Sequence, residues 1–142
     1  MFKEVLIPVR DGTTIGAAVY APETSGRFPA LLAASPYRYD NNVLPAGPQF
    51  LWRETGPVEF YVKQGYAYVH MDVRGCGKSG GEFELLGPNE QNDLYDAVEW
   101  IAKQPWSNGK VGAWASPTSA CPSGGWGSWR RRRSPAWAPT TA

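Results

Sequence analysis

The chain has 142 residues, enough for one domain with a single core, and 42% of them are hydrophobic while 19% are charged. The formal net charge of +1 excludes the strong overall field that attracts nucleic acid or an acidic membrane. The two cysteines, Cys76 and Cys121, are too few for a disulfide framework. Because the sequence shows no signal-peptide pattern and no apolar run of about 18–20 residues, we expect a soluble cytoplasmic protein.

The charge is unevenly distributed along the chain. Residues 1–114 carry ten Lys and Arg against thirteen Asp and Glu, and 10 − 13 = −3. Residues 115–142 carry four Arg and no acidic residue, and 4 − 0 = +4. This second stretch is rich in Ser, Pro, Gly, Trp and Arg and has neither helical nor strand periodicity. We therefore predict a domain over residues 1–114 and a disordered tail over residues 115–142.

The first half of the domain shows strand patterns. Residues 5–10 and 13–20 alternate in polarity around Asp11-Gly12, which is the strongest short signal for a hairpin. The apolar run 29–34 predicts a strand buried on both faces, and residues 66–71 predict another strand. Residues 35–55 form a long irregular stretch of the kind that is functional or disordered.

Helix patterns alternate with these strands. Residues 55–64 have a capping Thr, a Pro in the first turn and a Gly after the end. Residues 89–104 carry apolar side chains at helical spacing, with acidic residues in the first half. A turn at 107–109 precedes a strand that begins at Lys110. The order hairpin, strand, helix, strand, helix, strand predicts an α/β fold whose parallel sheet has helices on its faces.

Four motifs, in this order and spacing, resemble one family. They are Val9-Arg10-Asp11-Gly12, Ser35-Pro36-Tyr37, the segment 71–83 that contains Asp-Val-Arg-Gly-Cys-Gly-Lys-Ser-Gly-Gly, and the segment 96–112. The chain resembles, over about residues 1–114, the N-terminal part of the cocaine-esterase and Xaa-Pro dipeptidyl-peptidase (CocE/NonD) family of α/β-hydrolases. The resemblance implies the antiparallel hairpin and first parallel strands of a truncated hydrolase sheet. It also implies a small-molecule substrate (an acyl ester, an X-Pro peptide or an acyl-amide) and an acyl-enzyme, with no cofactor.

The resemblance also implies where the catalytic groups should be. In such enzymes a serine on a Gly-x-Ser-x-Gly turn attacks the carbonyl, a later Asp orients a still later His, and the His takes the proton. That turn should follow the strand at Lys110, but the chain reads Lys110-Val-Gly-Ala-Trp-Ala-Ser-Pro-Thr118. We therefore expect that the Ser, Asp and His of the triad are not present and that this chain alone is inactive. Tyr37 is the predicted site residue, donating its hydroxyl to the carbonyl oxygen as negative charge develops.

The genetic code offers a reason for the missing turn. If one G was lost after the Trp114 codon, tail codons can be chosen so that restoring it gives Gly-Ile-Ser-Tyr-Phe-Gly-Met-Ser-Gln-Trp. That sequence is the absent nucleophile turn entering its helix, with the second glycine three positions after the serine instead of two. CGG codons for residues 130–133 would likewise shift to GCG, a run of Ala suited to a helix. We infer a frameshift after Trp114.

Other interpretations compete with the hydrolase. Residues 72–79 end in Gly-Lys-Ser like a phosphate-binding loop, but Asp72 occupies the first glycine position and Gly80-Gly81 stand where a helix should continue. We favour a strand-end loop in which Asp72 and Arg74 hold local structure. His70, the only histidine, precedes the expected nucleophile, so we predict a packed or edge-strand residue. One His and two distant Cys fall short of a metal site.

The tail suggests the competing class, a non-enzymatic fragment that binds a partner. Arg130-Arg-Arg-Arg133 with nearby Trp residues is typical of a basic nucleic-acid patch, but four charges without a folded platform give weak, salt-sensitive binding. We therefore predict no nucleic-acid and no membrane partner, and the sequence leaves the oligomeric state open. Ser116, Ser119 and Ser123 lack glycine flanks and are not nominated as nucleophiles.

Overall fold

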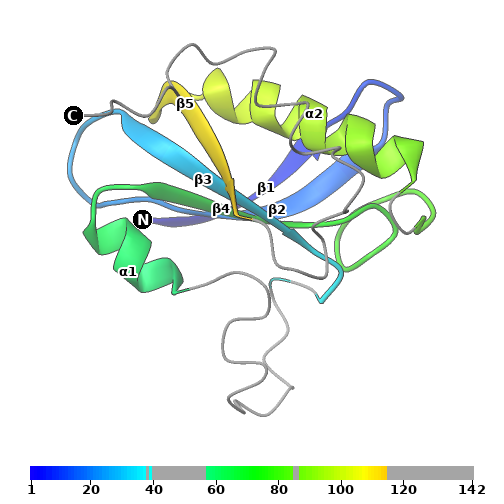
Figure 1. Ribbon diagram of the computed structural model, residues 1–142, viewed down its shortest axis with the longest axis horizontal. Coiled ribbons are helices and arrows are strands. Elements are labelled where there is room, and N and C mark those ends of the chain that lie inside the picture. Colours follow the sequence, from blue (N-terminus) through cyan, green and yellow to red (C-terminus); the bar gives the residue numbers. More distant parts are fainter. Residues whose placement is uncertain (38, 40–56, 85–86, 115–142) are drawn as a thin grey trace, which may run out of the picture.

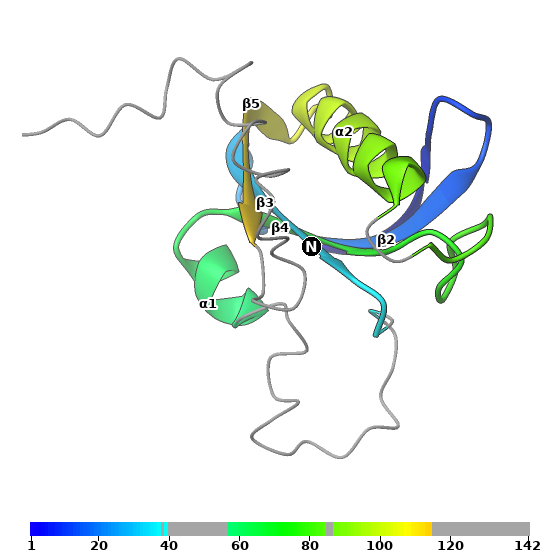
Figure 2. The same ribbon diagram turned by 45° about the vertical axis from the view of Figure 1, so that its right-hand side comes forward.

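The computed structural model describes residues 1–37, 39, 57–84 and 87–114. In this part of the chain the elements are β1 (Phe2–Pro8), β2 (Thr14–Tyr20), β3 (Phe28–Ser35), α1 (Val58–Lys63), β4 (Ala67–Asp72), α2 (Pro88–Ala102) and β5 (Ser107–Trp114). The strands form one twisted sheet, and the two helices lie on its opposite faces (Figures 1 and 2). The predicted α/β class is confirmed.

The sheet is mixed, with the strand order β1-β2-β4-β3-β5. β1 pairs with β2 and β2 pairs with β4 in antiparallel fashion, whereas β3 is parallel to both β4 and β5. The predicted hairpin is confirmed. The expectation of a parallel sheet holds for β3, β4 and β5, while β2 runs against its neighbour β4. A tight turn suffices for the antiparallel hairpin, but each parallel pairing needs a crossover, and α1 and α2 lie in those crossovers.

The hydrophobic core lies between the sheet and α2. Alternate side chains of every strand point to this face, as the period of two in a strand requires. Fully buried members include Ile7, Ile15, Leu32, Val69 and Met71, together with Ala97 and Ile101 from α2. Burying one large aliphatic side chain contributes about 1.5–3 kcal/mol, so this cluster is a main source of the sheet's stability. The predicted apolar stripe of the helix is confirmed, since Leu94 and Val98 pack against the same cluster.

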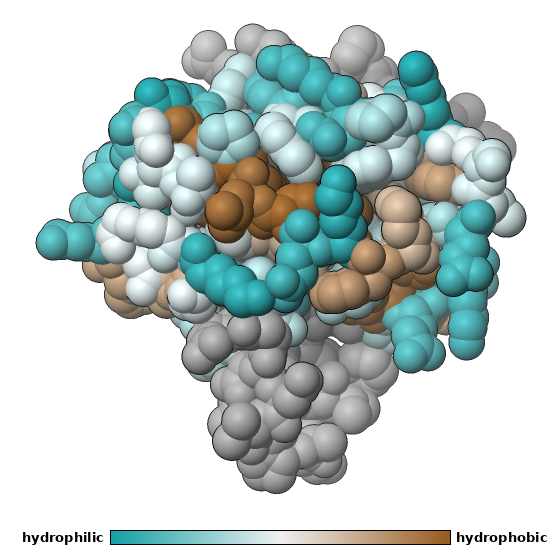
Figure 3. Space-filling view, turned by 180° about the vertical axis from the view of Figure 1, so that it is seen from behind, coloured by the Kyte–Doolittle hydropathy of each residue, from teal (hydrophilic) through white to brown (hydrophobic). Residues whose placement is uncertain are grey.

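The opposite face is covered less completely. The ring of Tyr61 from α1 stacks on Tyr68 of β4, with centroids 5.9 Å apart and planes 19° apart. None of the residues of α1 is buried, and Phe60 is 56% exposed. Seen from behind the view of Figure 1, the molecular surface shows patches of hydrophobic residues among hydrophilic ones (Figure 3). β4 is nevertheless buried at all six positions, because it lies between β2 and β3.

Three elements begin three residues away from their predicted starts. The first strand was expected over residues 5–10, and β1 spans Phe2–Pro8. The first helix was expected over residues 55–64, and α1 begins at Val58, with Pro57 at its N-cap position; Thr55 lies outside the described residues. The last strand was expected to begin at Lys110, and β5 begins three residues earlier, at Ser107.

The residues of the predicted 107–109 turn form an irregular start to β5. The backbone N–H of Gly109, whose φ is +83°, donates to Oγ of Ser107 at 3.1 Å. The N–H of Lys110 donates to Oδ1 of Asn108 at 3.0 Å. These hydrogen bonds are of the kind found in turns. The residues nevertheless belong to β5, whose pairing with β3 shifts in register between Phe28 and Ala30.

Two further points concern the chain as a whole. Within the ranges given above, neither helix has the length and apolar character that crossing a bilayer requires. The domain boundary predicted after residue 114 and the predicted disorder of residues 115–142 stay predictions, because residues 115–142 fall outside the described residues.

Candidate active site at the carboxyl edge of the sheet

The carboxyl ends of β3, β4 and β5 meet at one edge of the sheet because these strands are parallel. In the register, Ser35 at the end of β3 lies opposite Asp72 at the end of β4. On the other side of β3, Ala33 lies opposite Trp114 at the end of β5. In open α/β sheets, ligands bind beyond the carboxyl ends of the strands. This edge is therefore the candidate active site.

Tyr37, the predicted site residue, lies two positions beyond β3 at this edge. Its backbone N–H donates to Oγ of the fully buried Ser35 at 3.0 Å, which fixes the turn at the strand end. The side chain of Tyr37 is not packed away, since the residue is 43% exposed. On the neighbouring strand, Trp114 at the end of β5 lies in register with Ala33 of β3, four residues before Tyr37. The nucleophile turn expected after Trp114 lies outside the described residues.

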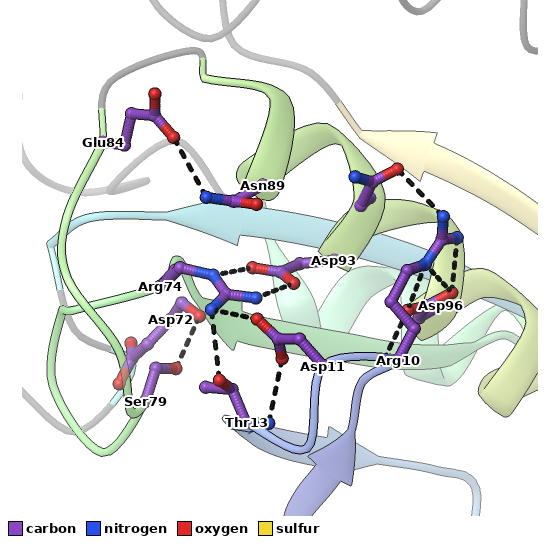
Figure 4. A network of polar contacts seen from close by, with 11 residues as sticks. Arg10, Asp11, Thr13, Asp72, Arg74, Ser79, Glu84, Asn89, Asp93 and Asp96 are labelled. Atoms are coloured by element: carbon purple, nitrogen blue, oxygen red, sulfur yellow. Dashed lines mark hydrogen bonds and ion pairs between the residues drawn. The ribbon is translucent and has the colours of Figure 1, made fainter.

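Asp72 connects several segments beneath this edge. One carboxylate oxygen accepts the backbone N–H of Tyr39 at 2.8 Å, and the other accepts the backbone N–H of Lys78 at 3.2 Å. The hydroxyl of Ser79 donates to the backbone carbonyl of Asp72 at 2.8 Å (Figure 4). The same hydroxyl accepts the backbone N–H of Gly16 at 2.9 Å. The ends of β3 and β4 and the start of β2 are thereby held together.

Backbone N–H groups of the loop that follows β4 are bound to protein acceptors, within the loop or in the adjacent strands. The N–H groups of Gly75, Cys76, Ser79 and Gly80 donate to the carbonyls of Gly80, Val73, Cys76 and Thr14, at 2.9–3.0 Å. The ammonium group of Lys78 lies 2.8 Å from a carboxylate oxygen of Glu4. A phosphate-binding loop needs such N–H groups and such a lysine for the ligand. The structure therefore disfavours the nucleotide-binding alternative and supports the strand-end loop that the sequence favoured.

Arg74 is the centre of a polar cluster that we call the Arg74 clamp, made of the buried residues Arg74 and Asp93 and the more exposed Asp11 and Thr13. Two guanidinium nitrogens of Arg74 lie 2.8 and 2.6 Å from the two carboxylate oxygens of Asp93 in α2. The third guanidinium nitrogen of Arg74 donates to a carboxylate oxygen of Asp11 at 2.7 Å and to the hydroxyl of Thr13 at 3.1 Å (Figure 4). Both partners lie in the turn between β1 and β2. Arg74 is 8% exposed and Asp93 1% exposed, so this planar, two-pronged pair is shielded from water.

The charges of the clamp shift one another's protonation. Hydrogen bonds from Arg74 and Thr13 lower the pKa of Asp11 to about 2. Hydrogen bonds to Asp93 and Asp11 raise the pKa of Arg74, so the guanidinium stays charged. From the sequence we predicted that Arg74 stabilises the loop at the end of its strand, but Asp11 and Asp93 were not predicted as its partners. These lie 63 and 19 positions away, beyond the reach of any local pattern.

A second ion pair fastens the hairpin to the middle of α2. The guanidinium of Arg10 lies 2.8 Å from Oδ1 of Asp96, and the backbone N–H of Arg10 donates to Oδ2 at 2.9 Å. A further nitrogen of Arg10 donates to the side-chain oxygen of Asn92 at 3.0 Å. These contacts raise the pKa of Arg10 and lower the pKa of Asp96. The pair is more open to solvent than the clamp, since the Arg10 side chain is 50% exposed.

His70 is a packed residue, as one of the two predicted alternatives held. It lies in the central strand β4 rather than at an edge, is 5% exposed, and meets the ring of Tyr39 edge-on at 6.2 Å. Among the described residues, no three His, Cys, Asp or Glu side chains gather as a metal site requires.

The fold defines a class of protein. A leading antiparallel pair, followed by parallel strands in the order β4-β3-β5 with helices on both faces, is the first part of an α/β-hydrolase sheet. Residues 11–119 match the family model described as X-Pro dipeptidyl-peptidase (S15 family). The chain belongs to this family of α/β-hydrolases, which confirms the resemblance seen in the sequence.

Known proteins agree with this assignment. The chain is 36% identical over 111 residues to the cocaine esterase of Rhodococcus sp. (strain MB1 Bresler), a match that covers 76% of this chain and 18% of the esterase. Its fold is similar to that of a CocE/NonD family hydrolase from Staphylococcus aureus, with a TM-score of 0.67, 29% identity and coverage of 80% of this chain and 22% of that one. An α-amino acid ester hydrolase gives a TM-score of 0.63 at 28% identity, over 80% of this chain and 20% of the other.

Two consequences follow from these similarities. The family and the relatives named above are of the esterase and peptidase type, and the partner-binding and nucleotide-binding alternatives are not favoured. The chain also spans only about a fifth of the length of the relatives that it matches.

Proposed function

We propose that this chain is the N-terminal part of a serine hydrolase that cleaves small esters or amides through an acyl-enzyme. The observation that carries the proposal is the shared carboxyl edge of β3 and β5. Tyr37 lies two residues beyond the end of β3, and Trp114 at the end of β5 lies in register with Ala33 of β3. The names of the relatives, a cocaine esterase, an X-Pro dipeptidyl-peptidase family and an α-amino acid ester hydrolase, support acyl esters, X-Pro peptides or acyl-amides as substrate classes.

Tyr37 would act when the serine hydroxyl adds to the carbonyl carbon. The electron pair of the C=O bond then moves onto oxygen, and the phenol hydroxyl of Tyr37 donates a hydrogen bond to this oxyanion. A backbone N–H next to the serine would supply the second donor. The tie between the Tyr37 N–H and Ser35 supports this role, because a donor that is held in place costs no reorganisation during the reaction.

We further propose that the 142-residue chain shows no serine-dependent turnover, because the Gly-x-Ser-x-Gly turn is not present after Trp114. The test is hydrolysis of a chromogenic ester such as p-nitrophenyl acetate by the purified chain. Turnover above the buffer rate that a serine-directed phosphonate abolishes would contradict this proposal.

The cause that we propose for the missing turn, loss of one G after the Trp114 codon, has a direct test. The nucleotide sequence in that region should read Gly-Ile-Ser-Tyr-Phe-Gly-Met-Ser-Gln-Trp once the base is restored. Codons that cannot give this motif in either other frame would rule out the frameshift.

The role of Tyr37 is testable in the frame-restored protein. We expect Tyr37→Phe to lower kcat by about 10²–10³-fold, as expected for one oxyanion donor. Tyr66→Phe is the matched control: Tyr66 is 37% exposed but precedes β4, at the opposite end of the parallel strands. Equal kcat values for the two variants would remove Tyr37 from the site.

A further inference from the structure

The segment that carries Tyr37 is fastened on both sides. At Tyr37, the backbone N–H donates a hydrogen bond to Oγ of Ser35, the last residue of β3. Two residues later, the N–H of Tyr39 is bound at 2.8 Å to the carboxylate of Asp72, the last residue of β4. The backbone at Tyr37 is therefore bracketed by two side chains that are themselves fully buried.

We infer that Asp72 is a positioning residue, which sets the place of the Tyr37 hydroxyl by anchoring the segment that follows it to the end of β4. The inference rests on the function proposed above for Tyr37. Its basis is the hydrogen bond between the Asp72 carboxylate and the Tyr39 N–H, together with the register that places Ser35 and Asp72 side by side.

The choice of an aspartate at this position has a physical reason. A buried carboxylate is unfavourable unless hydrogen bonds compensate for its lost hydration, and backbone N–H groups from two different loops bind this one. Hydrogen bonds to a charged acceptor are about twice as strong as neutral ones, so each holds its loop more firmly than a serine or asparagine acceptor would. Asp72 thereby couples the segment after β3 to the loop after β4.

Contacts of the Tyr39 ring also hold this residue against β4 and the loop that follows it. Tyr39 is 9% exposed, its ring meets His70 edge-on at 6.2 Å, and the ammonium group of Lys78 lies 5.6 Å from the ring centroid. The ring and the N–H of Tyr39 are thus both held against β4 and its loop, whereas the side chain of Tyr37 remains 43% exposed. The fixed backbone thus gives the accessible side chain of Tyr37 a defined starting point at the carboxyl edge of the sheet.

The test is amide hydrogen exchange, measured by NMR on the 142-residue chain and its Asp72→Asn variant. Asparagine keeps the shape of the side chain but replaces an acceptor oxygen by a donor and removes the charge. We expect the Tyr39 and Tyr37 amides to exchange about tenfold faster, because the neutral amide oxygen of asparagine is a weaker acceptor than the carboxylate, with Val69 unchanged. The matched control is Ser79→Ala, which loosens the loop after β4 without touching the carboxylate and should leave Tyr39 unchanged.

An unchanged exchange rate at Tyr39, or a change that is not confined to this segment, counts against the inference. Unchanged exchange at Tyr39 in Asp72→Asn would show that the carboxylate does not anchor the segment. Faster exchange throughout, with Val69 included, or loss of the folded spectrum would show that Asp72 supports the whole fold and not this segment in particular. The exchange result is independent of turnover. A local effect at Tyr39 combined with an unaffected Tyr37→Phe enzyme would therefore refute the proposed function and not the anchor.

Discussion

Removal of the Arg74 guanidinium should destabilise the fold more than any other single loss of charge in the described residues. In the Arg74→Met variant the carboxylate of Asp93 would stay buried without its partner, since the side chains of Arg74 and Asp93 are only 10% and 2% exposed. Breaking a buried ion pair from one side costs about 3–5 kcal/mol. Domains of this size have a total free energy of unfolding of about 5–15 kcal/mol, so the loss would be a large part of it.

Urea unfolding followed by far-UV circular dichroism measures this loss. With a denaturant slope of about 1–3 kcal/mol per M, the midpoint for Arg74→Met should fall by at least about 1 M. Arg10→Met is the matched control, because it removes the same charge from a pair whose arginine side chain is 50% exposed and screened by water. Equal midpoints for the two variants would refute the reasoning that burial gives the clamp its strength.

Three further outcomes follow from the structure. Because Arg74 lowers the pKa of Asp11 to about 2 from an ordinary 3.8, the stability contributed by Asp11 is complete above about pH 4 and is lost as the pH falls toward 2. Acid unfolding of Asp11→Asn should be less steep across that window. Gly75→Ala should lower the calorimetric Tm more than Gly12→Ala: both glycines have positive φ, but a Cβ at Gly75 would collide with the backbone of Phe83 whereas the space at Gly12 is open. Ile101→Ala, at a fully buried position of α2, should cost about 2–5 kcal/mol in urea unfolding, and a smaller loss would show that the helix repacks.

The sequence predicted the elements well because each depends on local chemistry. The alternation on either side of Asp11-Gly12 led to the correct hairpin, and the stripe of Leu94, Val98 and Ile101 identified the face of α2 that packs on the core. The start of β5 was misplaced because Ser107 and Asn108 bind backbone N–H groups as turn residues do, although the chain stays in the sheet there.

The arrangement of the elements required information that local patterns do not hold. The position of β4 between β2 and β3 depends on contacts between residues far apart in sequence, and so do both arginine pairs. At the candidate site, Tyr37 was predicted through the resemblance of the sequence to a family, and Asp72 was predicted only to stabilise the loop at the end of its strand. The structure adds the hydrogen bond from Tyr39, which no spacing rule would reveal across 33 positions.

The strand order has a consequence for synthesis on the ribosome, where the chain emerges from its N-terminus at about 5–20 residues per second. The β1–β2 hairpin and β3 are both complete by residue 35, yet they share no neighbour until β4 arrives at residues 67–72. During that interval the edges of β2 and β3 that later pair with β4 have no partner strand, and unpaired strand edges can associate with other chains. We expect nascent chains halted before residue 67 to be captured by chaperones, and those halted beyond residue 72 to be released as the sheet closes around β4.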